Sequence, residues 1–197
     1  MTEQFIRRFV GLLRKNDLIE EAEYENFVYV LLGDMESLIV ISSILFLSIV
    51  IGRFIPTVSF LLCFFSLRER TGGYHLDSYL KCYIGTIFLY LIISFISSKI
   101  YESQEILLVF VMIAMVVILR LGSINHPNMD MEKEELRENK KMSRIIVITE
   151  VFVLLCLYWV GNAGMIVTYS GMAIVLCAGL LLLAKLTGQE VKKYERK

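Results

Sequence analysis

The sequence predicts an all-α polytopic membrane protein with six transmembrane helices, preceded by N-terminal amphipathic helices. Hydrophobic residues make up 56% of the 197 residues, and they come in long blocks. Such blocks are typical of membrane-spanning helices, because a helix satisfies its own backbone hydrogen bonds in lipid. The chain also has only two prolines and 12 glycines, so little interrupts these helices.

Residues 1–36 precede the first long apolar block and are rich in charge. Residues 2–15 have the pattern of a basic amphipathic helix, which can lie in the membrane interface. A pair of cytosolic helices that only pack against each other is an equally good interpretation. Asp17 and Glu20 resemble a capping box and predict a second helix at about residues 18–34. The apolar face of the first helix consists of Phe5, Ile6, Phe9, Leu12 and Leu13.

Six apolar segments follow and predict the spans. The second segment is short for a bilayer of about 30 Å and contains Pro56, so a tilted or re-entrant helix is also compatible with it. Residues 161–164 leave room only for a tight turn, which predicts an antiparallel hairpin of the last two spans. The six predicted spans are residues 37–52, 54–67, 79–97, 105–121, 144–161 and 164–186.

Lysine and arginine are distributed unevenly over the loops. If the N-terminus is cytoplasmic, all but two of the 20 basic residues lie on the cytoplasmic side, and only Arg53 and Lys99 lie outside. This bias predicts a cell-membrane protein with both termini cytoplasmic. The predicted organisation is an N-terminal region (1–36), a membrane domain (37–186) with an internal loop at 122–143, and a tail (187–197). Because the net charge is zero, no nucleic-acid partner is expected.

A polar, glycine-containing segment, residues 68–82, is predicted at the cytoplasmic face. It holds one of two histidines and one of four cysteines, His75 and Cys82, seven residues apart. On a straight helix this spacing is close to two turns, which places both side chains on one face about 10 Å apart. An imidazole near a thiol promotes the thiolate, the nucleophilic form. The segment therefore predicts Cys82 as a nucleophile and His75 as its base.

The neighbouring residues suit the same chemistry. Arg68 and Arg70 add positive charge, and Gly72 and Gly73 give the backbone freedom and leave room for a peptide. Free N–H groups at these glycines are candidates for an oxyanion hole. Asp77 is the nearest group that could orient the imidazole, but two residues apart on a helix they face away from each other. Both a dyad and a triad remain open.

Other interpretations compete with catalysis. A zinc site needs three or four ligands, and the sequence contains no H-E-x-x-H pattern or second cysteine pair, so no metal or other cofactor is expected. A small membrane transporter or peptide exporter would need polar groups within its spans, and Glu150 is the one clear carboxylate there. In a structural or regulatory protein, His75 and Cys82 would only pack.

The residues Arg68, Gly72-Gly73, His75 and Cys82 resemble the motif of the accessory gene regulator B (AgrB) family. These are membrane cysteine endopeptidases of Gram-positive quorum sensing, and the layout of about 200 residues and six spans is also similar. The resemblance implies cleavage of an AgrD-like precursor peptide at its C-terminal side through a thioester on Cys82. It further implies that His75 carries the proton and that the product closes into a thiolactone or lactone.

The resemblance also implies how the protein assembles and which residues surround the reaction. Arg68 and Gly73 match positions that the family keeps near the dyad, and Arg70 and Gly72 are grouped with them as candidates for substrate binding or positioning. The expected partners are the precursor peptide, the lipid bilayer and a second copy in a homodimer.

Overall fold

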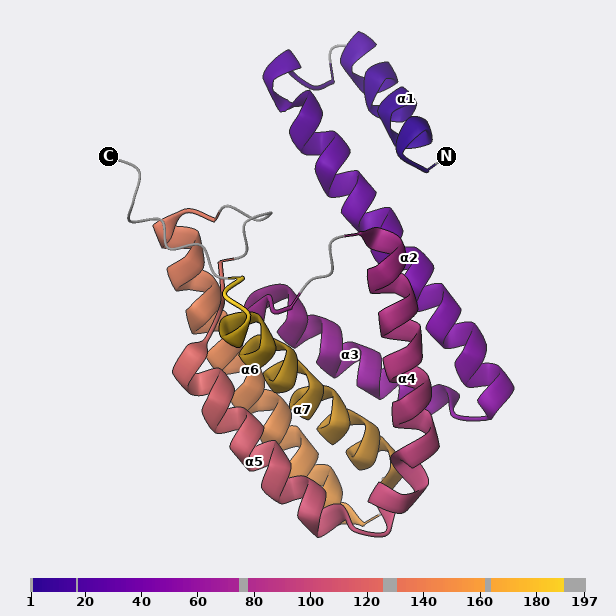
Figure 1. Cartoon of the computed structure of the whole chain (residues 1–197), viewed down its shortest axis with the longest axis vertical. Coiled ribbons are helices and arrows are strands. Elements are labelled where there is room, and N and C mark those ends of the chain that lie inside the picture. Colours follow the sequence, from indigo (N-terminus) through magenta and orange to yellow (C-terminus); the bar gives the residue numbers. More distant parts are fainter. Residues whose placement is uncertain (1, 17, 75–77, 126–130, 162–163, 190–197) are drawn as a thin grey trace.

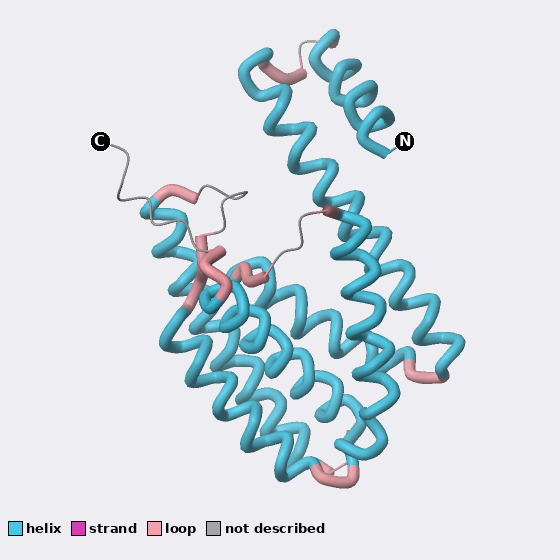
Figure 2. The backbone as a smooth tube through the Cα atoms, in the orientation of Figure 1, coloured by secondary structure: helices cyan, strands magenta, loops and turns pink. Residues whose placement is uncertain are grey.

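The computed structural model describes residues 2–16, 18–74, 78–125, 131–161 and 164–189, and these form helices without any strand (Figures 1 and 2). The predicted all-α class is therefore confirmed. The helices are α1 (Thr2–Lys15), the short 3₁₀ helix η1 (Glu21–Glu23), α2 (Tyr24–Ile51), α3 (Phe54–Thr71), α4 (Tyr79–Tyr101), α5 (Gln104–Leu121), α6 (Lys133–Val160) and α7 (Gly164–Leu186).

Within the described residues, five helices are long and apolar enough to cross a membrane, which confirms a multi-pass membrane protein. They are the helix that includes Glu21–Ile51, and α4, α5, α6 and α7. Helix α3 is not among them, so the six predicted spans are one more than the structure supports. The reason is that α3 has 18 residues and its last turn already carries Arg68 and Arg70.

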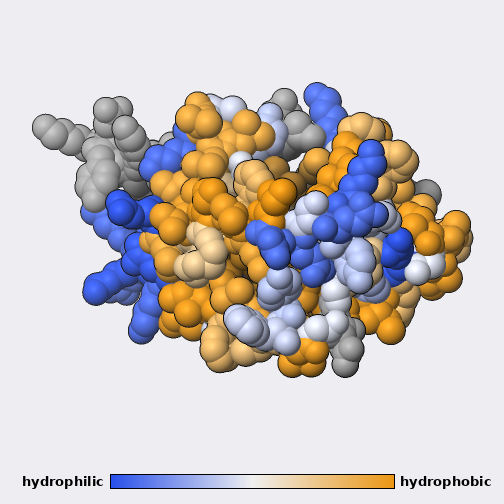
Figure 3. Space-filling view, turned by 90° about the horizontal axis from the view of Figure 1, so that it is seen from below, coloured by the Kyte–Doolittle hydropathy of each residue, from blue (hydrophilic) through white to orange (hydrophobic). Residues whose placement is uncertain are grey.

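Helices α2 to α7 run alternately up and down, although α3 crosses the bundle obliquely (Figure 1). The C-terminal ends of α3, α5 and α7 consequently lie at the same end of the bundle as α1, and those of α2, α4 and α6 lie at the other (Figure 1). Seen from that other end, polar residues gather near the centre and hydrophobic residues surround much of them (Figure 3). Apolar side chains such as Phe95 and Trp159 remain largely exposed along the helices, as expected for lipid contact.

Helix α7 forms the centre of the bundle. It packs most extensively against α3 and α5, and also contacts α4 and α6. Small residues on α7 allow this close approach, because lipid-embedded helices associate mainly through van der Waals packing. Gly171 illustrates the fit, since a Cβ atom at this position would lie 3.0 Å from Leu107 Cδ2 and 3.2 Å from Val111 Cγ2 on α5.

Two hydrogen bonds between side chains fix helix α4 against its neighbours. Tyr83 Oη and Ser43 Oγ of α2 share a hydrogen bond of 2.9 Å, and Tyr90 Oη and Thr57 Oγ1 of α3 share one of 2.8 Å. The second pair is fully buried, where an unpartnered hydroxyl would be costly. These bonds set the position of the first turns of α4 relative to α2 and α3.

The N-terminal region is a packed helix pair. Ile6 and Val10 of α1 are buried against Val28 of α2, and Arg7 makes ion pairs with Glu3 and Glu25. The outer apolar face of α1, with Phe5, Phe9 and Leu12, is exposed.

The second predicted helix differs from the observed one in both its start and its end. It begins at Tyr24 rather than at about residue 18, and it continues into the first predicted span as the single helix α2. The predicted boundary at residue 36 therefore falls inside one helix. Gly33 and Asp34 favour a helix only weakly, but residues 33–37 contain no proline and include the good helix formers Met35 and Glu36, so the helix does not break there. Asp17, half of the predicted capping box, lies outside the described residues.

We expect Gly171→Val to lower the melting temperature of the detergent-solubilised protein, because the added side chain overpacks the contact between α5 and α7 by about 1–3 kcal/mol. Gly179→Val is the matched control, since nothing lies within 4 Å of a Cβ at that position of the same helix. Equal melting temperatures for the two variants would show that α5 and α7 do not pack as described.

Candidate functional site

Cys82 lies in the first turn of α4, at the end of the bundle that also carries α1. The helix begins at Tyr79, directly after the extended residue Ser78 (φ −141°, ψ 146°), and the Cys82 N–H donates to the Ser78 carbonyl at 3.0 Å. The thiol is only partly buried. The positive end of the helix dipole therefore lies beside this sulfur, a setting that favours a thiolate.

The first N–H groups of α4 have no hydrogen-bond acceptor among the described residues. Ser78 makes no capping hydrogen bond through its side chain, and in the described part of the chain no acceptor is found for the N–H groups of residues 79–81. Unsatisfied donors of this kind at a helix N-terminus bind anions and stabilise developing negative charge.

The straight helix predicted to join His75 to Cys82 is wrong. Residues 72–74 are not helical and Ser78 is extended, so the spacing of seven residues does not correspond to two turns of one helix. Gly72 and Gly73, which precede the histidine, each adopt a backbone conformation that ends α3. The extended residue Ser78 lies between His75 and Cys82, so α4 starts as a separate helix. His75 and Asp77 lie outside the described residues.

Gly72 and Gly73 form the turn that follows α3. Their φ angles are +65° and +130°, which residues with a side chain rarely adopt. A Cβ atom on Gly72 would lie 3.0 Å from the Ile124 carbonyl oxygen, and one on Gly73 would collide with the Arg68 guanidinium. The two glycines predicted for backbone freedom are thus required by this close approach.

Arg68 clamps the same turn. Its guanidinium donates to the carbonyl oxygens of Gly72 and Tyr74, the latter at 2.7 Å. Arg68 therefore fixes the turn from which the chain continues toward α4, the helix that carries Cys82.

Backbone hydrogen bonds hold the turn to the rest of the bundle. The Tyr74 N–H donates to the Leu180 carbonyl of α7, and the Ile124 N–H, after α5, donates to the Thr71 carbonyl, each at 3.0 Å. These two hydrogen bonds join the turn to α7 and to the segment after α5, both distant in sequence, and so fix the residues just before the histidine.

Arg70 makes a contact outside the glycine turn. Its guanidinium donates to Asn139 Oδ1 of α6 at 3.1 Å, and Asn139 in turn contacts the sulfur of Met131. Asn125 closes this buried network through two hydrogen bonds to the Met131 backbone. The structure therefore brings Arg68, Gly72 and Gly73 together, while Arg70 braces the start of α6.

The sequence analysis missed Asn139 as a structural partner and treated Asn125 only as part of a turn. Asn139 stands within a charged stretch whose residues look solvent-exposed, so no local signal marks it. Its role depends on a contact with a residue 69 positions earlier, which periodicity and spacing do not reveal.

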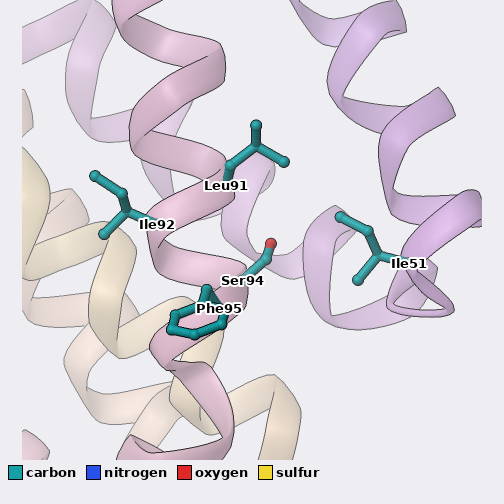
Figure 4. A pocket seen from close by; sticks show the side chains of 5 residues that line it. All are labelled: Ile51, Leu91, Ile92, Ser94 and Phe95. Atoms are coloured by element: carbon teal, nitrogen blue, oxygen red, sulfur yellow. The ribbon is translucent and has the colours of Figure 1, made fainter.

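A groove of about 1030 Å³ runs between α2 and α3 and ends at this turn. Its polar end includes Arg68, Glu69 and Gly72, and its walls are mostly apolar. A second, apolar hollow of about 610 Å³ lies between the end of α2 and α4, where Ser94 points toward Ile51 (Figure 4). Because it begins nine residues beyond Cys82 on α4, this second hollow is not part of the candidate site.

Glu150 of α6 lies inside the bundle. Ser66 Oγ of α3 donates to its Oε1, while Oε2 is buried and has no hydrogen-bond partner among the described residues. A carboxyl group held in this way within a span is costly, and in membrane proteins it often has a function.

The chain was compared with known proteins. The model of a family described as accessory gene regulator B matches residues 6–184, which is most of the chain. No curated protein and no solved structure matches it. The matched range includes the glycine turn, Cys82 and all of α2 to α6.

We expect Gly73→Ala to slow alkylation of Cys82 at neutral pH by about three- to tenfold. The added methyl group displaces the Arg68 guanidinium, and moving a charge by a few ångströms changes the free energy of a thiolate by roughly 1 kcal/mol. The measurement is the rate of maleimide labelling, followed by mass spectrometry.

Gly52→Ala is the control, because Gly52 also has a positive φ (+73°) but no atom within 4 Å of a Cβ. This variant should lose about 1–2 kcal/mol of stability through backbone strain alone and keep the labelling rate. Unchanged labelling in Gly73→Ala would contradict the clamp formed by Arg68.

Proposed function

Because the chain belongs to the accessory gene regulator B family, which is involved in the processing and export of a quorum-sensing peptide, we propose that it is a membrane cysteine endopeptidase. The observation that carries this proposal is the position of Cys82, partly buried in the first turn of α4 and beside the positive end of that helix. Its substrate is an AgrD-like precursor peptide, cleaved at its C-terminal side.

In the first step the Cys82 thiolate attacks the carbonyl carbon of the scissile peptide bond. The tetrahedral intermediate carries a negative charge on oxygen, which the free N–H groups at the start of α4 are suited to stabilise. The C–N bond then breaks, the amine of the C-terminal fragment takes a proton, and the rest of the peptide remains on Cys82 as a thioester.

In the second step a thiol or hydroxyl within the bound peptide attacks the thioester. A new S–C or O–C bond closes a thiolactone or lactone ring, and Cys82 leaves as a thiolate. No water is consumed, so the reaction needs the internal nucleophile to reach the thioester before water does. Holding it in place makes the attack intramolecular, which is worth effective molarities of about 10⁵ M or more.

His75 is the proposed proton carrier, as the resemblance implies. It takes the proton of the Cys82 thiol and delivers it to the departing amine, and it then takes the proton of the nucleophile that closes the ring. Arg68 and Gly73 are positioning residues in this proposal, supported by their contacts at the turn. Arg70, which joins α3 to Asn139 of α6, and Gly72, which allows the close approach of the Ile124 carbonyl group, complete the proposed set of positioning residues.

The proposal places this site at the cytoplasmic face of the cell membrane, with both termini on the same side. It is supported by the lysine and arginine distribution, because among the described residues only Arg53, just before α3, and Lys99, in the last turn of α4, belong to the opposite end of the bundle. Residues 37–186 would then form the peptidase domain, between the N-terminal helices (1–36) and the tail (187–197). The resemblance further implies a homodimer.

Peptide export is the second candidate activity, and Glu150 is the observation that favours it. Its buried carboxyl group lies where a transported charge or proton would pass. If Glu150→Gln abolishes export in proteoliposomes while Cys82→Ala does not, transport is the better assignment.

We expect Cys82→Ala to lower processing by at least about 10³-fold, because loss of a nucleophile removes the whole covalent route. Cys156→Ala is the control, since this exposed cysteine lies on α6 away from the site. Cleavage of the precursor is followed by mass spectrometry in proteoliposomes. Processing by Cys82→Ala at the wild-type rate would rule out the thioester mechanism.

The dyad makes a separate prediction about pH. Across a series of pH values, Cys82 should be alkylated faster than Cys63, Cys156 and Cys177, because the proposed imidazolium of His75 pairs with its thiolate. His75→Ala should remove this advantage, and His126→Ala should not. If Cys82 reacts at the same pH in all variants, His75 does not act on the thiol.

Deletion of residues 2–15 tests whether α1 takes part in substrate binding. The exposed face of Phe5, Phe9 and Leu12 is suited to an amphipathic peptide, so the deletion should raise the apparent KM far more than it lowers kcat. The opposite result, a lower kcat with an unchanged KM, would assign α1 to the stability of the bundle.

A further inference from the structure

The groove between α2 and α3 is large enough to hold part of a peptide. Its volume of about 1030 Å³ is at the upper end of the range for ligand pockets, which is roughly 300–1,000 Å³. Leu38 and Ile41 of α2 face Leu61 and Leu62 of α3 across it. These walls suit apolar side chains.

The groove is continuous with the candidate site. Arg68 and Gly72 line its polar end and also form the turn after α3. A chain lying in the groove would therefore end at the turn that precedes α4 and Cys82.

Two carboxylates give this polar end its charge preference. Asp34 of α2 and Glu69 of α3 both line the groove and are both exposed. Neither makes an ion pair in the described part of the chain, whereas the Arg68 guanidinium is bonded to the carbonyl groups of the turn. A lysine or arginine side chain would be attracted to this end, and the phosphate of an anionic lipid would be repelled by it.

We propose that this groove is the binding site for an apolar segment of the substrate peptide that carries a basic residue, which pairs with Asp34 and Glu69. The inference rests on the proposed peptidase function and specifies the chemistry of the substrate beside the scissile bond. The groove orients the peptide so that the bond to be cleaved reaches Cys82, and it shields that part of the chain from water.

Binding is measured without turnover, in the full-length Cys82→Ala protein in phosphatidylcholine nanodiscs. The probe is a fluorescent ten-residue peptide of leucine, alanine and serine with one lysine, compared with its glutamate twin by fluorescence anisotropy. We expect the lysine peptide to bind about three- to tenfold more tightly, the effect of one or two exposed charge pairs. Asp34→Lys should reverse this preference.

A steric test uses two exposed serines of α2. Ser37 lines the groove and Ser42 does not, so Ser37→Trp should weaken binding of the lysine peptide about tenfold or more while Ser42→Trp leaves it unchanged. Equal binding by the two tryptophan variants, or no preference between lysine and glutamate peptides, overturns the proposal.

Two further outcomes would assign the groove to another occupant. Displacement of the lysine peptide by phosphatidylglycerol in the nanodisc, with no effect of Asp34→Lys, would identify a lipid site. A change from dimer to monomer in Ser37→Trp but not in Ser42→Trp would identify a contact between copies of the chain. Alkylation of Cys82 is measured in parallel in a Ser37→Trp protein that keeps this cysteine. Normal reactivity of Cys82 together with failed peptide selectivity overturns the groove proposal and leaves the peptidase proposal standing.

Discussion

The clamp between Arg68 and the turn after α3 is the constraint on which the candidate site depends. The chain must leave an oblique central helix and reach the start of α4 at the crowded end of a bundle. Carbonyl groups freed at this turn lie away from bulk water, and a guanidinium with several donors in a fixed plane can satisfy two of them at once. Since the Arg68 guanidinium occupies the space where a Cβ atom of residue 73 would lie, this arginine conformation requires glycine at position 73.

The position of Cys82 follows from this turn and from the packing of α4. The turn is held to α7 through Leu180 and to the segment after α5 through Ile124, whereas α4 is held to α2 and α3 by hydrogen bonds of two tyrosines, Tyr83 and Tyr90. The glycine turn and α4 are therefore each anchored to other helices, and for the proposed peptidase this holds Cys82 in place before a peptide binds.

The sequence was sufficient for the helical class, for the bounds of α1, α5 and α7 and for the grouping of residues 68–74 and 78–82 at one end of the bundle, whereas α6 begins at Lys133 rather than at residue 144. Long apolar blocks and glycines that end helices are local signals, so α5 and α7 agree with prediction to within one residue. The helix geometry of His75 and Cys82 was wrong because spacing alone does not show where a helix begins. The partners Asn139 and Leu180 could not be predicted, because their contacts depend on how distant helices pack.

The same packing explains why α3 differs from the other helices. It ends in Arg68, Glu69 and Arg70, so its apolar part is too short for an independent span, yet it packs more extensively against α7 than any other pair of helices does. Protein rather than lipid surrounds much of it, and polar groups on it can therefore be satisfied by neighbouring helices, as Ser66 and Thr57 are. A helix that is buried, oblique and polar at one end brings charged side chains to one edge of the membrane. There, a thioester would be shielded from water on one side and open to a peptide on the other.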